Sequence, residues 1–174
     1  MGTAGKVLAI IGAVVGLASV TLGFVLPAFF SWFKIEGSYG GTVVVGFYIT
    51  GFGTLTSVPP YYTGFAYLEL VGGIVLVVGA ILCIVSAAKG SKAPGIVGGI
   101  LMLVSPLILI VDLLLLSGAD FGALIYSLGG PANASILWGS FSPAPGVLLS
   151  WGIWIGAFVA LGAGVLGLIG GATV

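Results

Sequence analysis

The sequence predicts an all-α membrane protein in which a four-transmembrane-helix bundle carries a small extracellular antiparallel β cap. Three observations carry this prediction. Charged residues make up 5% of the 174 residues, too few to cover a soluble domain of this size. Four long apolar runs alternate with segments of a different composition. The chain also holds 32 glycines, which are common in membrane helices. We therefore expect one tetraspan domain over residues 1–174.

The composition also limits the chemistry of the chain. It contains no His and a single Cys, Cys83, so we expect neither an intrachain disulfide nor a metal site. Cys83 lies mid-span, where it is expected to pack as a small apolar residue. A net charge of zero leaves no basic stripe for nucleic acid. The sequence has no nucleophile–base pair and no phosphate-binding loop, so no enzymatic activity and no cofactor are expected.

The apolar runs are long enough to cross a bilayer, whose hydrocarbon core of roughly 30 Å needs about 20 helical residues. A signal peptide is the competing interpretation of the first run. The apolar core of a signal peptide has about 7–15 residues, and the first run is longer, which favours a retained span. The expected helices cover about residues 6–30, 65–88, 94–117 and 147–172.

The lysines predict the orientation of the spans. Lys6, Lys89 and Lys92 lie on one side of the membrane if the spans alternate, and the positive-inside rule makes that side cytoplasmic. Both termini are then cytoplasmic, and the outer segments 31–64 and 118–146 are extracellular. Aromatic residues gather at the expected outer boundary as an interfacial belt. They are Trp32, Phe33, Tyr61, Tyr62, Phe65, Tyr67, Trp151 and Trp154.

Small residues recur along the expected helices at spacings that place them on one helix face. Such rows mark seams where helices pack closely by van der Waals contact. In the first interpretation they build the monomer's own bundle. In the second, the last helix also docks a neighbouring subunit, because it carries rows on more than one face. The candidate packing residues are Gly12, Gly16, Gly72, Gly79, Gly152, Gly156, Ala160 and Gly164.

The outer segments have strand-like composition. Residues 42–50 are rich in β-branched and aromatic side chains, and they can pair with residues 33–36 as a hairpin around a glycine-rich turn. Residues 123–128 and 135–141 flank a Gly-Gly-Pro turn and predict a second hairpin. An isolated hairpin is marginally stable in water, so we expect both to join in one small sheet that stands on the bundle.

Two carboxyl groups, Glu69 and Asp112, lie inside the expected spans, about one turn below the outer surface on antiparallel neighbours. An ionisable group within a membrane span is costly and is a functional candidate by default. Glu69 lies in the first turn of its helix, where the helix dipole favours an anion, whereas Asp112 lies near a C-terminus, where the dipole opposes one. We expect Asp112 to be neutral, or hydrogen-bonded to a donor such as Lys34 or an aromatic hydroxyl, as a structural anchor. A proton- or ion-handling role is the alternative.

Two further residues stand out. Pro106 removes a backbone hydrogen bond within the third expected span and should kink it. Asn133-Ala134-Ser135 is an N-glycosylation sequon on the expected outer side, which makes Asn133 a candidate glycosylation site.

Leu26-Pro27 followed by Trp32 resembles the end of the first claudin helix. The last span is similar in texture to its claudin counterpart, since Trp151-Gly152 precedes a series of glycines: Gly162, Gly164, Gly167, Gly170 and Gly171. In topology the chain resembles the claudin and peripheral myelin protein superfamily of tetraspan proteins, with a long, strand-bearing first outer loop. The first outer segment lacks the Gly-Leu-Trp motif and paired cysteines of claudins, and the chain has no Arg. The resemblance implies a structural protein that associates side by side and across a gap.

These observations predict a non-enzymatic membrane scaffold or structural subunit. It would self-associate or pack with other membrane subunits through its Gly/Ala seams and its apolar cap, with membrane lipids around it. A second hypothesis is an accessory subunit or carrier for protons, ions or lipids that uses Asp112 and Glu69. A third, a membrane protein of a viral or vesicle coat, is not separated from the first by sequence.

Overall fold

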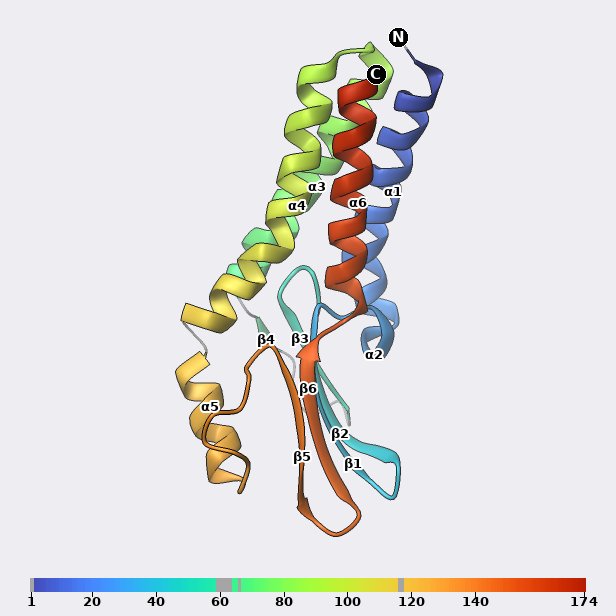
Figure 1. The fold of residues 1–174 in the computed structure, drawn as a ribbon. Coiled ribbons are helices and arrows are strands. Elements are labelled where there is room, and N and C mark those ends of the chain that lie inside the picture. The colour runs from blue at the N-terminus through green and yellow to red at the C-terminus, as the bar shows by residue number, and fades with distance from the viewer. Residues whose placement is uncertain (1, 59–63, 66, 116–117) are drawn as a thin grey trace.

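The computed structural model describes residues 2–58, 64–65, 67–115 and 118–174. Helices form a bundle at one end of the molecule and strands form a sheet at the other, and both termini lie at the end of the bundle that faces away from the sheet (Figure 1). The described residues include four helices that are long and apolar enough to cross a membrane, as expected for a multi-pass membrane protein. They are α1 (Thr3–Val25), α3 (Tyr67–Lys89), α4 (Lys92–Leu115) and α6 (Ile155–Thr173).

The four long helices pack as a ring. α1 packs against α3 and α6, α4 packs against the same two helices, and the diagonal pairs barely touch. α3 and α4 form the expected antiparallel hairpin, because Gly90 takes a φ of +65° in the turn between them. Ser86 donates its hydroxyl to the carbonyl oxygen of Ser91 at 2.6 Å and closes this turn.

Small residues fill the contacts between the helices. A Cβ added at Gly12 would lie 2.6 Å from the backbone nitrogen of Gly167 on α6, and one added at Gly79 would lie 2.6 Å from the carbonyl oxygen of Gly98 on α4. A Cβ added at Gly162 of α6 would meet nothing within 4 Å. The small-residue rows therefore point into the monomer's own bundle. Of the predicted packing residues, those buried within helices are Gly12, Gly16, Gly72, Gly79, Gly156, Ala160 and Gly164.

Within the described residues, six strands form one antiparallel sheet in the order β4-β3-β2-β1-β6-β5. The predicted first hairpin is confirmed, with Gly40 (φ +56°) and Gly41 (φ +84°) as the two turn residues between β1 and β2. Residues of both predicted outer segments share one sheet, as expected, because β5 of the second segment pairs with β6 and β6 pairs with β1. The strands are β1 (Phe33–Tyr39), β2 (Thr42–Ile49), β3 (Thr54–Val58), β4 (Gly64–Phe65), β5 (Trp138–Ala144) and β6 (Val147–Ile153).

Two predicted helix boundaries are wrong. The last span begins at Ile155 and not at residue 147, because the preceding residues form β6. One apolar run continues from strand into helix, so composition does not mark the boundary. The first span ends at Val25, and Pro27 begins the short helix α2 (Pro27–Phe30). Gly152 was predicted to pack between helices, but it lies in β6, opposite Lys34 of β1.

The predicted second hairpin, residues 123–128 with 135–141, is also wrong. Residues in its first half belong to the helix α5 (Gly118–Ser127), and the hairpin of this segment is β5–β6. Phe121, Leu124, Ile125 and Leu128 repeat at helical spacing. This helical spacing, and not strand alternation, determines the structure of the segment that precedes the Gly-Gly-Pro sequence. The apolar side of α5 packs against the sheet.

Trp32 joins the cap to the bundle. Its side chain is fully buried, and its indole N–H donates to the carbonyl oxygen of Ser19 on α1 at 3.3 Å. A Cβ added at Gly51 would lie 2.7 Å from the indole, one at Gly72 of α3 3.7 Å, and one at Gly156 of α6 2.8 Å. The ring is therefore surrounded by three spans and the turn after β2. Trp32 was predicted to lie in the interfacial belt, and the structure instead places it in the core.

Gly156→Ala tests this close packing, because the added Cβ would meet the carbonyl oxygens of Phe30 and Ser31. We expect the free energy of unfolding to fall by about 1–3 kcal/mol, the usual cost of overpacking. Gly162→Ala on the same helix is the matched control, and it should be neutral or stabilising by up to about 1 kcal/mol. Equal unfolding midpoints for the two variants in a denaturant titration in detergent would contradict the packing described here.

Candidate functional site

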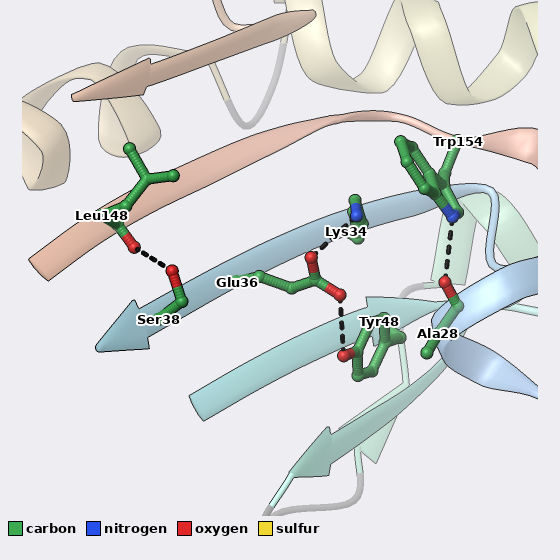
Figure 2. Close-up of polar contacts among 7 residues, drawn as sticks. All are labelled: Ala28, Lys34, Glu36, Ser38, Tyr48, Leu148 and Trp154. Carbon is green, nitrogen blue, oxygen red and sulfur yellow. Dashed lines mark hydrogen bonds and ion pairs between the residues drawn. The ribbon is translucent and has the colours of Figure 1, made fainter. Parts of the chain in front are cut away.

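The first outer segment places a small polar network on one face of the sheet, shown in Figure 2. Lys34 and Glu36 lie two residues apart on β1, so their side chains share that face. Lys34 Nζ lies 2.7 Å from Glu36 Oε2, and the Tyr48 hydroxyl of β2 donates to Glu36 Oε1 at 2.9 Å. The Lys34 ammonium lies 3.4 Å from the centroid of the Trp154 ring. The Trp154 indole N–H donates to the Ala28 carbonyl oxygen at 2.9 Å and connects the network to α2.

This network neutralises and covers its own charges. The side chains of Lys34 and Glu36 are 14% and 13% exposed. Burial, with help from the hydrogen bond and negative charge of Glu36, raises the pKa of Tyr48 to about 12, so this hydroxyl remains a neutral donor. Lys34 was named as a donor for Asp112, but the structure pairs it with Glu36 instead.

The two intramembrane carboxyl groups come together near the sheet end of the bundle. Glu69 lies in the first turn of α3 and is 1% exposed. Its carboxyl group lies beside that of Asp112, which is near the C-terminus of α4. Glu69 Oε1 has no hydrogen-bond partner among the described residues. The same residues hold no group of three or more His, Cys, Asp or Glu that could bind a metal ion.

An aromatic cluster holds α5 against the other face of the sheet. The Phe121 ring lies 5.6 Å from the Trp151 ring and 6.2 Å from the Phe33 ring, both in edge-on geometry. Phe141 meets Trp151 at 6.3 Å, and the Trp151 indole N–H donates to the Ser135 carbonyl oxygen at 2.8 Å. Trp151, predicted as a belt residue, is therefore part of the cap's core and is 4% exposed.

The aromatic residues that are exposed near the junction of bundle and sheet are mostly different from those predicted. Phe29 of α2, Tyr67 at the start of α3 and Trp138 at the start of β5 are each more than 60% exposed, at 62%, 80% and 64%. Trp154 is half-buried in the polar network, and the predicted Tyr61 and Tyr62 lie outside the described residues. Tyr67 was predicted as a belt residue, whereas sequence reasoning missed Phe29 and Trp138, because their exposure depends on where α2 and β5 begin.

The ends of the two hairpins form an exposed apolar surface at the pole of the molecule farthest from the bundle (Figure 1). The Gly40 N–H donates to the Gly146 carbonyl oxygen at 3.0 Å and holds the two turns together. Ser38 adds a longer hydrogen bond of 3.5 Å to the carbonyl oxygen of Leu148. We call this patch the hairpin-tip surface, and it consists of Tyr39, Val43, Val44 and Leu148, which are 40–63% exposed.

Two remaining candidates occupy ordinary positions. Asn133 is exposed in the turn region between α5 and β5. Cys83 is buried in the bundle, with its sulfur 3.7 Å from the Gly95 carbonyl oxygen, as a packing residue would be. A comparison with models of known protein families and with curated proteins found no match to this chain. The functional argument therefore depends on the geometry of these groups.

Tyr48→Phe tests the polar network through its pH dependence. The folded-state pKa of Tyr48 lies above the unfolded value near 10, so the folded protein binds the hydroxyl proton more tightly than the unfolded chain does. The network's contribution to the free energy of unfolding should be fully present below about pH 10 and should be lost as the pH rises toward 12. We expect the wild type to lose more stability than Tyr48→Phe over that interval in thermal unfolding. At neutral pH the variant should lose about 1–3 kcal/mol, the worth of a hydrogen bond to a charged group. Parallel pH profiles would rule out this role for Tyr48.

Proposed function

We propose that the protein is a non-enzymatic structural subunit, held in the membrane by four spans, whose copies associate through the hairpin-tip surface. The observation that carries the proposal is the apolar and uncharged character of this surface. Tyr39 and Val44 are its most exposed members, at 63% and 54%. Large exposed apolar side chains that gather at one end of a protein often mark a site where a partner binds.

The distribution of charge supports self-association. Lys34 and Glu36, the charged residues of the sheet, neutralise each other beneath the surface. In a symmetric contact each surface meets its own copy, and a charged surface would repel itself. The hairpin-tip surface carries no charge, so this repulsion does not arise.

The helix seams are assigned a different role from the cap. Gly156 and Gly164 of α6 face backbone atoms of the same chain, and a Cβ at either position would lie within 2.8 Å of them. Lipid tails supply no hydrophobic drive between helices, so close backbone approach is needed to hold the monomer together. Association between copies is therefore assigned to the cap, whose far pole fits the contacts across a gap that the claudin resemblance implies.

Val44→Lys tests this association, because it places a charge on the hairpin-tip surface and creates like-charge repulsion between copies. We expect the association constant to fall by about tenfold or more, or about 1.4 kcal/mol. Sedimentation in detergent would measure it. Ala132→Lys is the matched control, since Ala132 is exposed in the cap but lies outside this surface. Equal association of the wild type and both variants would refute the proposed contact.

The orientation is part of the proposal. Lys6, Lys89 and Lys92 all lie at the end of the bundle that holds the termini, which supports a cytoplasmic position for that end. A cysteine at Ala132 should react with an impermeant maleimide in intact cells, whereas one at Ala93 should be shielded. The native Cys83 is buried and should add little background. Labelling in the reverse pattern would place the cap in the cytoplasm.

A second candidate function is favoured by the contact between Glu69 and Asp112. A pair of carboxyl groups inside a span is a typical element of proton and cation pathways. It is also explained as a structural anchor between α3 and α4, which agrees with the burial of Glu69. The leading proposal needs only the anchor.

Asp112→Asn separates the two roles, because Asn keeps the hydrogen-bonding capacity but cannot release a proton. On the structural account, Asp112→Asn should preserve the unfolding midpoint and liposomes with either protein should show no proton flux. Asp112→Leu leaves the Glu69 carboxyl without this partner and should cost about 1–3 kcal/mol. A flux that is present in the wild type and absent in Asp112→Asn would establish the transport role.

A further inference from the structure

An apolar cavity lies between α5 and the sheet, on the face opposite the polar network. Its volume is about 270 Å³, and the nine residues that line it are all apolar. They come from β1, β2, β6 and α5. Cores are close-packed, so a hollow of this size in a small cap needs an explanation.

Gly37 lies in the floor of this cavity. It pairs with Val45 on β2 and with Leu149 on β6, so it is the middle one of three residues that lie side by side across neighbouring strands. Its backbone is not in the left-handed region that favours glycine, and a Cβ here would lie 2.7 Å from the Val45 side chain. The Val45 side chain therefore leans over Gly37, and both residues form part of the cavity floor under α5. Ile125 of α5 is 1% exposed and closes the inner side of the cavity.

The cavity opens sideways between β2 and α5. Val45 and Phe47 on one rim are 37% and 38% exposed, and Leu124 and Leu128 on the other are 51% and 48% exposed. The lining residues of α5 extend from Phe121 to Leu128, which is roughly 10 Å along a helix. The opening is thus elongated and entirely apolar.

From this geometry we infer that the cavity binds one alkyl chain of a lipid or fatty acid. A peptide segment is a poor occupant, because its backbone N–H and C=O groups would be buried against apolar side chains without hydrogen-bond partners. One aromatic side chain would underfill it, since a cavity of about 150 Å³ already holds benzene. An alkyl chain has no polar atoms to satisfy and matches the elongated shape. This inference does not depend on self-association of the cap.

Photolabelling in nanodiscs tests the inference with two probes. The first is a phosphatidylcholine that carries a diazirine near the end of one acyl chain. The second is diazirine-bearing palmitic acid added to unlabelled phosphatidylcholine nanodiscs. Two variants fill the cavity from opposite rims, Val45→Phe and Leu124→Trp. Thr42→Phe is the control, because Thr42 is exposed on β2 and is not part of the lining. Thermal unfolding verifies that each variant is folded.

We expect labelled peptides that contain residues 45–47 or 121–128. Labelling there should fall by about tenfold or more in both filled variants and stay unchanged in Thr42→Phe. Labelling by the phospholipid alone would identify a bilayer lipid as the source, and labelling by palmitic acid alone would identify a free fatty acid. Labels confined to the lipid-facing sides of the bundle helices would overturn the inference. Equal cap labelling of wild type and folded Val45→Phe would overturn it as well.

Discussion

The structure depends on the burial of Trp32 at the junction of cap and bundle. This indole lies among α1, α3 and α6 and hydrogen-bonds the backbone of Ser19. The backbone hydrogen bonding of the sheet extends to Trp32. The backbone N–H of Trp32 donates to the Ile49 carbonyl oxygen at 2.7 Å, and the backbone N–H of Trp154 donates to the Trp32 carbonyl oxygen at 2.8 Å. A flat ring fits here because Gly51, Gly72 and Gly156 present no side chains. Since lipid does not drive helices together, this fit couples the position of the sheet to the spacing of the spans.

The sheet divides the cap into two environments. One face holds the Lys34–Glu36 pair with Tyr48 and Trp154, and the other holds α5, the aromatic cluster and the apolar cavity. Because a strand alternates its side chains between faces, residues 33–37 of β1 contribute to both. Covering the charges on one face leaves the hairpin-tip surface uncharged and apolar. The proposed role in association follows from that arrangement of charge more than from any single contact.

Sequence reasoning predicted the parts of the fold that depend on local composition. The four long apolar helices, the first hairpin and the positions of Glu69 and Asp112 near helix ends follow from apolar runs, β-branched residues and helix ends. Features that depend on tertiary packing were not predicted. A slip of one residue in strand register moves every side chain to the other face, so the burial of Trp151 is a property of the β1–β6 pairing. Lys34 pairs with Glu36 because β1 forms and brings Tyr48 of β2 beside them, which spacing alone does not show. The cavity appears only when β1, β2, β6 and α5 come together, because its lining residues are far apart in the sequence.

The central claim is that copies of this chain associate through the cap. Extraction from native membranes into copolymer nanodiscs, followed by mass measurement of the intact particles, tests it most directly because no detergent intervenes. The account predicts particles that contain two or more copies, and it predicts single copies after cleavage of the cap between β1 and β2. Particles that contain one copy at every expression level would contradict the account.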